Sequence, residues 1–194
     1  MVIFLASDHF SENSGYAGSS SLSRADLVRA SIENKFGKFP AQKKVVKLLF
    51  ERGFCVTSAG KVTSGNIEIP HVQIGNEIGV DRRVVDTAAG KIAEDPELFT
   101  VFQHLHSVCF LRDAAPYLGL GVIVIVPEDS AGIGIIAGVT KVISDAGFSI
   151  RQAVSDDPYF TPEPRLTIIT NEPLPGDVVD AVRKTSGVKG VSLY

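Results

Sequence analysis

Residues 119–126 read Gly-Leu-Gly-Val-Ile-Val-Ile-Val, and this run of β-branched side chains predicts a buried strand over 121–126. A helical pattern follows from Gly134 to Ala146 and stops at Gly147. Beyond it the pattern predicts, in order, strands at 148–154 and 165–170, a helix at 176–185 and a strand at 189–193. The order β-α-β-β-α-β is that of a split βαβ, or ferredoxin-like, fold.

The first half of the chain is predicted to be helical. Apolar residues recur at helical spacing from Leu22 to Phe36, and a second helix begins at Pro40 and stops at Gly53. The turn-forming residues 64–66 predict a short hairpin. Its strands are expected at 54–58 and 66–69, and further helices at 71–78, at 82–93 and, as a continuation, at 94–110.

These elements predict an α+β chain of two domains. The helical domain is expected at 23–110, a linker at 111–118 and the ferredoxin-like domain at 119–194. Residues 1–22 are rich in serine and poor in core-forming side chains, so they are predicted to be a disordered extension, or an artefact of an upstream start codon.

Composition narrows the class of protein. Of the 194 residues 44% are hydrophobic and 21% charged, as in soluble globular proteins. The apolar run at 119–126 is far shorter than the roughly 20 residues that cross a bilayer. Two cysteines, Cys55 and Cys109, are too few for a disulfide framework. We therefore expect a cytoplasmic protein and set membrane, secreted and disordered classes aside.

Charge is distributed unevenly along the chain. The net charge is −3, yet the stretch from Arg24 to Lys91 holds 12 basic and 7 acidic residues. From Arg112 to the end there are 7 basic and 10 acidic residues. A basic half joined to an acidic half favours a polyanionic partner for the first domain.

The span 71–90 meets the steric requirements of a DNA-binding helix-turn-helix. Gly75 leaves room for close crossing, Gly79 allows the positive φ of a three-residue turn, and Asp81 is placed as N-cap of the second helix. With the hairpin, the domain is expected to be winged-helix-like. The residues expected to face duplex DNA are Arg82, Arg83, Asp86, Thr87 and Gly90. The alternative is a structural three-helix core that binds nothing.

The segment 119–194 resembles an ACT domain, the small ligand-sensing fold of amino-acid metabolism. The match lies in Gly134, in Gly147-Phe-Ser-Ile150, and in the buried face of the intervening helix, Ile135, Val139, Val142 and Ile143. Two positions depart from the ACT signature, because Ala131 stands in place of its aspartate and Ile133 in place of its proline.

Together with the preceding helices, the chain from about residue 30 resembles an archaeal family of predicted regulators of amino-acid metabolism that contain an ACT domain. The matching segments are 67–71, 79–86, 110–113 and 150–160. The resemblance implies a helix-turn-helix followed by an ACT domain, an amino-acid effector, and a homodimer formed through paired ACT domains.

A small amino acid is the expected ligand. The free N–H groups at a glycine-started helix favour its carboxylate, and its ammonium needs an acceptor. The residues expected at this site are Glu128, Asp129, Ser130, Gly132, Ile133, Gly134 and Ser149. Since the resemblance implies ligands between paired domains, Arg151 and Gln152 are secondary candidates.

The functional hypothesis is therefore an amino-acid-responsive, DNA-binding regulator that is not an enzyme and needs no cofactor. The main alternative is a regulatory protein that contacts a biosynthetic enzyme without binding DNA. A small nucleotide-dependent enzyme is a third, because Gly132–Ala137 reads G-x-G-x-x-A with Asp156 some twenty residues on.

The sequence contains two further patterns of metal-ligating residue types. His104, His106 and Cys109 form H-x-H-x-x-C, which offers three ligands to zinc without an evident fourth. The acidic, proline-rich loop 156–164 lacks the spacing of a calcium loop and is expected to be turn chemistry.

Overall fold

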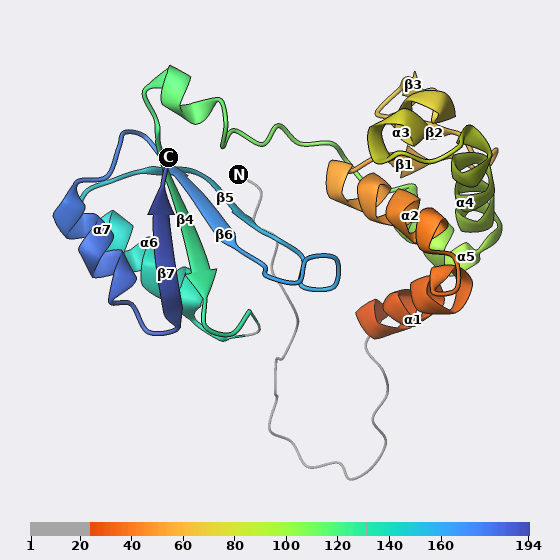
Figure 1. The fold of residues 1–194 in the computed structure, drawn as a ribbon. Helices are drawn as coiled ribbons and strands as arrows, with labels where there is room; N and C mark the ends of the chain where they lie inside the picture. The colour runs from red at the N-terminus through yellow and green to blue at the C-terminus, as the bar shows by residue number, and fades with distance from the viewer. Residues whose placement is uncertain (1–23, 131) are drawn as a thin grey trace, which may run out of the picture. The chain divides into compact units, whose positions relative to one another are not determined.

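The computed structural model describes residues 24–130 and 132–194, which form two compact units, 24–109 and 110–194 (Figure 1). The extension predicted at 1–22 and the departure at Ala131 lie outside the described residues. Within the described residues, no helix has both the length and the apolar character needed to cross a membrane.

The first unit contains five helices, which pack on one another, and a small sheet. Its helices are α1 (Arg24–Phe36), α2 (Pro40–Arg52), α3 (His71–Ile78), α4 (Arg82–Glu94) and α5 (Pro96–Phe102). The sheet is antiparallel, in the order β1 (Cys55–Val56), β2 (Val62–Ser64) and β3 (Ile67–Ile69). The core is built from fully buried side chains, among them Phe36, Val45, Leu49, Val85, Ile92, Leu98 and Phe102.

Two details of this unit differ from the prediction. The expected two-stranded hairpin is a three-stranded sheet, because Val62 is fully buried and its strand pairs with both neighbours. The helix expected to continue through 94–110 ends at Phe102. The chain beyond it passes against β1 and the end of α2 instead. The Cys55 thiol donates a hydrogen bond to the Leu105 carbonyl, and the Ser107 hydroxyl donates one to the Arg52 carbonyl.

Asp95 holds the two ends of this helical unit together. Its Oδ1 accepts hydrogen bonds from the N–H groups of Glu97 and Leu98, which caps α5. Its Oδ2 lies 2.9 Å from Lys35 Nζ on α1. Burial raises the pKa of the Asp95 carboxyl, but the Leu98 N–H and the Lys35 ammonium outweigh it and leave the pKa below its ordinary value.

The second unit has the predicted β-α-β-β-α-β order. Its elements are β4 (Gly121–Pro127), α6 (Ile135–Asp145), β5 (Ile150–Ser155), β6 (Leu166–Thr170), α7 (Gly176–Arg183) and β7 (Val188–Leu193). The sheet order is β5-β6-β4-β7 with every neighbouring pair antiparallel. This is the strand order of a split βαβ fold, so the prediction from the 119–126 run is confirmed.

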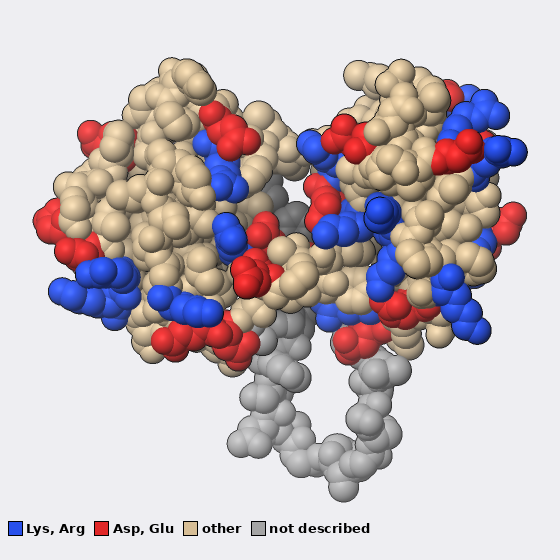
Figure 2. Space-filling model, in the orientation of Figure 1, with Lys and Arg blue, Asp and Glu red and all other residues tan. Residues whose placement is uncertain are grey.

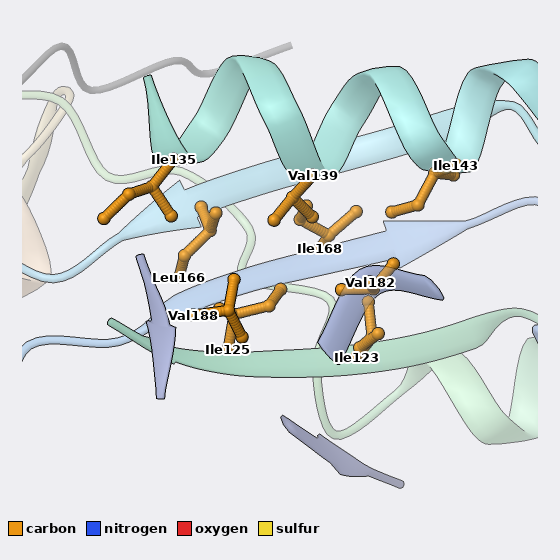
Figure 3. Close-up of a cluster of buried hydrophobic side chains, with 9 residues drawn as sticks. All are labelled: Ile123, Ile125, Ile135, Val139, Ile143, Leu166, Ile168, Val182 and Val188. Carbon is orange, nitrogen blue, oxygen red and sulfur yellow. The ribbon is translucent and has the colours of Figure 1, made fainter. Parts of the chain in front are cut away.

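Both faces of the sheet are covered. In Figure 3, Ile135, Val139 and Ile143 project from one side of α6 onto the isoleucines of β4 and β6, and Val182 of α7 joins the same cluster. On the other face, residues 111–118, where the sequence indicates a linker, contain a 3-10 helix, η1 (Ala115–Leu118). Leu111 and Ala115 pack there against Leu120, Val122, Val124 and Ile169.

The antiparallel sheet excludes the dinucleotide-binding interpretation of residues 132–137. That site needs adjacent parallel strands and a tight turn from strand to helix. Here β4 pairs with β6 and β7, both antiparallel, and the loop 128–134 separates it from α6.

A glycine pair tests the close packing of α3 on α4. A Cβ on Gly75 would lie 2.6 Å from the Val80 carbonyl oxygen, whereas one on Gly90 would meet nothing within 4 Å. Alanine gains about 1 kcal/mol of helix propensity over glycine. We expect Gly90→Ala to stabilise the unit by up to that amount and Gly75→Ala to destabilise it by about 1–3 kcal/mol through overpacking. Urea unfolding followed by circular dichroism measures both, and shifts of the same sign would contradict the packing.

The lowered pKa of Asp95 makes stability depend on pH. The ionised carboxylate stabilises the folded state fully above its ordinary pKa of 3.8, and this contribution is lost as the pH falls through the lower folded value. Asp95→Asn should therefore lose about 1–2 kcal/mol at neutral pH, and the difference from wild type should vanish at acid pH. Glu51→Gln, which breaks an exposed pair with Lys47, is the control. A difference that persists unchanged into acid would contradict this role.

Candidate functional site

The residues predicted to face DNA lie on one side of α4. Arg82, Arg83, Asp86 and Thr87 are exposed, and Gly90 is half-buried. The opposite side of the helix packs into the core through Val85, Ala88, Ala89 and Ile92. The hydrophobic pattern of the sequence therefore predicted correctly which side of α4 is buried. Its polar side is accessible to a partner.

A three-residue turn joins α3 to α4. Gly79 adopts the left-handed conformation, φ 68°, which glycine takes at little cost. The Val80 N–H donates to the Gly75 carbonyl at 2.8 Å, so the chain turns back sharply after α3. The turn leaves Asp81 at the entrance to α4.

Asp81 caps α4 and binds an arginine at the same time. Its Oδ1 accepts from the Arg83 N–H at 2.8 Å and from Arg83 Nε at 3.1 Å. These bonds lower the pKa of the Asp81 carboxyl and raise the pKa of the Arg83 guanidinium. The Arg83 side chain is nonetheless 85% exposed, so Asp81 binds it through Nε and leaves the rest of the guanidinium in solvent.

Asp86 joins the two helices on the exposed face. His71, the first residue of α3, places Nδ1 2.6 Å from Asp86 Oδ1. The other carboxylate oxygen lies 3.5 Å from Nε of Arg82, one turn earlier on α4. The contact between His71 and Asp86 has no local periodic signal in the sequence, because the two residues lie fifteen positions apart across a turn.

The net charge of this unit is lower than the window 24–91 indicated. Residues 24–109 hold 12 basic and 10 acidic residues, because Glu94, Asp95 and Glu97 fall just beyond that window. In Figure 2, blue and red side chains alternate over the visible face of the unit without merging into one basic surface. Strong sequence-independent attraction to a polyanion is therefore not expected.

The loop before α6 is the candidate ligand loop. Gly134 precedes the helix with φ 88°, and no side chain caps the first turn of α6. The loop is tied down at Glu128, whose N–H donates to the Gly187 carbonyl, and by the Gly132 N–H, which donates to that of Asp129. Ser130 is exposed and the Ile133 side chain is 93% exposed, so the region is open to solvent.

Ser149 is not part of that loop's surroundings. Gly121 and Ile150 are both paired with Thr170, so β5 begins at the end of the sheet where β4 also begins. Gly134 follows the far end of β4, and α6, about 16 Å long by its eleven residues, separates the two. One chain therefore cannot bring Ser149 and the Gly134 helix start to the same small amino acid, which corrects the expected composite site.

The secondary candidates on β5 differ in access. Arg151 is exposed and lies where the register of β5 shifts against β6. Gln152 is buried, and its Oε1 accepts a hydrogen bond from the Leu111 N–H at 3.0 Å. Gln152 thus anchors the segment that covers the sheet, a structural role that the sequence did not indicate.

The remaining motifs have structural partners. The rings of His104 and His106 bond through Nδ1 to the carbonyls of Thr100 and His104. Among residues 24–130 and 132–194, no three His, Cys, Asp or Glu side chains are grouped as metal ligands. In the loop 156–164, Asp156 and Asp157 accept hydrogen bonds from backbone N–H groups of Arg165 and Tyr159.

No protein-family model matches the chain, and no curated protein matches it. Among solved structures, the ACT domain from GTP pyrophosphokinase of Chlorobium tepidum is similar, with 26% identity over 39% of this chain and 96% of that domain and a TM-score of 0.30. A protein designated PH0061 matches with 11% identity over 79% of this chain and 88% of that one, with a TM-score of 0.24. Because both TM-scores are low, the folds of the two units rest on their own strand order and packing.

Proposed function

We propose that this protein is a cytoplasmic, non-enzymatic regulator of amino-acid metabolism that binds duplex DNA through α4 and a small amino acid through the loop before α6. The observation that carries the proposal is the polar face of α4. This helix follows α3 across a three-residue turn, buries one side in the core and presents two arginines near its start. A helix so arranged, in a winged-helix-like unit, suits the major groove.

The charge balance of the first unit makes a dimer part of the proposal. A net charge of +2 over residues 24–109 supplies little nonspecific affinity, and a single small module buries too little surface to bind tightly. In the described sheet β5 and β7 are both edge strands. Soluble proteins normally cover such edges, and edge pairing between second units would give a two-fold assembly with two copies of α4.

A dimer also supplies what one chain lacks at the ligand loop. If two β5 strands pair antiparallel along their full length across a two-fold axis, Ile150 of one copy lies opposite Ser155 of the other. The start of β5, with Ser149 and Arg151, then reaches the end of the neighbouring sheet that carries the loop 128–134. The amino-acid carboxylate would bind the free N–H groups of α6, and Glu128 or Asp129 would accept from its ammonium.

A regulator that acts by protein contact is the second candidate. Tyr117, 92% exposed, and Leu118 lie side by side in η1, and large exposed apolar side chains suit protein interfaces. In that case the second unit would contact a biosynthetic enzyme and the first unit would be structural. DNA binding by the intact chain separates the two functions.

The DNA-binding proposal predicts a charge-specific loss. Arg82→Ala with Arg83→Ala should weaken binding of the full chain to duplexes with a randomised centre, since both arginines are near the start of α4. The slope of log affinity against log salt should fall by about one for each of them that contacts a phosphate. The control, Lys141→Ala with Arg183→Ala, removes two exposed charges from the other unit. Equal affinity in wild type and the α4 variant, by fluorescence anisotropy, would contradict the assignment.

The ligand proposal predicts loss of amino-acid binding in Gly134→Val. Valine is strained at φ 88°, so the start of α6 should rearrange. Gly119, just before β4, has a φ of 70° and a Cβ there would meet no heavy atom within 4 Å, so Gly119→Val should be strained in the same way yet still bind. Calorimetry with each common amino acid measures binding, and the bound ligand should change DNA affinity by the factor by which DNA changes ligand affinity. No heat from any of them at millimolar concentration would leave only the DNA-binding proposal.

A further inference from the structure

Both arginines of the α4 face make their closest charged contacts through Nε. Asp86 Oδ2 lies 3.5 Å from Nε of Arg82, and Asp81 Oδ1 accepts from Nε of Arg83 at 3.1 Å. Neither guanidinium donates a hydrogen bond from its terminal nitrogens to a described residue. With Nε next to a carboxylate, the outer end of each planar fork is the part left for a partner.

The two pairs differ in what holds the carboxylate, because Asp81 is held within α4 and Asp86 also from α3. Asp86 is held from the other helix by His71, whose side chain is only 16% exposed. The Asp86 carboxylate is therefore held by a residue of α3 as well as carried by α4. The Arg82 side chain, 65% exposed, contacts a group that both helices position. Holding a long side chain in place before binding reduces the entropy lost when the complex forms.

A pair of opposite charges discriminates between the two acceptors that duplex DNA offers. Beside a phosphate, the Asp86 carboxylate would meet a second negative charge and oppose binding. Beside the major-groove edge of guanine, the target is uncharged and presents two acceptors, N7 and O6, to a bidentate donor. The carboxylate would then lie near base amino groups, which donate to it rather than repel it.

We propose that Arg82 reads a guanine in the major groove and that Asp86, held by His71, is the positioning residue that directs it there. The inference rests on the proposed DNA binding and names the base that the recognition face selects. Because the net charge of the unit is small, its affinity for DNA should depend on base sequence more than on salt concentration.

The first test separates a fork from a point charge. The full chain selects from duplexes with a randomised centre, and the selected site is then compared with single-base variants by anisotropy. Wild type should prefer guanine at one position by roughly ten- to a hundred-fold. Arg82→Lys keeps the charge without the bidentate fork, so it should lose that preference while its salt slope stays near that of wild type. If Arg82→Lys retains the guanine preference, the reading is wrong.

The second test isolates the positioning role of Asp86. Asp86→Ala frees Arg82 and removes a negative charge, so nonspecific affinity and salt slope should rise while the guanine preference falls. A merely structural role would lower affinity for all sequences alike, which would overturn the assignment to Asp86. Thermal unfolding of each variant reports whether it folds, and Arg82→Lys, an exposed change, keeps the test decisive if Asp86→Ala does not.

The outcomes also distinguish a failure of the guanine contact from a failure of the proposed DNA binding. If wild type binds no duplex at low salt, the proposed DNA binding fails and the guanine reading fails with it. If wild type binds duplexes with no base preference at any position, DNA binding stands and the guanine reading is overturned.

Discussion

The contact between Gly75 and the Val80 carbonyl is the constraint on which the candidate recognition surface depends. A side chain at 75 would come within 2.6 Å of that oxygen, so α3 and the turn can meet only through glycine. The close approach lets the chain reverse in three residues and brings the first residue of α3 next to the second turn of α4. The exposed face is therefore built by two helices, although its arginines come from one.

Charge on that face is arranged in pairs. Asp81 is both the N-cap of α4 and the partner of Arg83, and Asp86 is shared between His71 and Arg82. Exposed pairs of this kind contribute little to stability, because water solvates both partners well. They place Nε of two long side chains beside carboxylates, on a unit of almost neutral charge. This arrangement suits the proposed selective contacts better than general attraction to a polyanion.

In the second unit, the length of the βαβ crossover separates the candidate ligand groups. The helix that joins β4 to β5 returns the chain to the end of the sheet where it started, so residues before α6 and after it lie at opposite ends. Edge pairing of two sheets is the simplest geometry that brings them together again. In the proposed dimer, ligand binding and assembly would be coupled, since neither chain alone has the full set of contacts.

The sequence by itself determined the elements whose residues face one core. The β-branched Ile and Val run of β4 favours a strand, whereas the apolar stripe of α6 and the spacing of Ile74, Val85 and Ala88 favour helices. The structure has those elements in the predicted order. Local chemistry was equally readable: Pro40 begins α2, Gly53 ends it and Asp81 caps α4. The exposed side of α4 followed from the same pattern.

Tertiary structure decided what depends on residues far apart in the chain. The strand at 62–64 exists because it pairs on both sides. Beyond the helix that ends at Phe102, the Leu105 carbonyl bonds to Cys55 and the Ser107 hydroxyl to the Arg52 carbonyl. The His71–Asp86 contact, the burial of Gln152 beneath Leu111 and the separation of Ser149 from Gly134 likewise have no local signature. Periodicity reports which side of an element is buried, but only the folded chain decides which side chains meet.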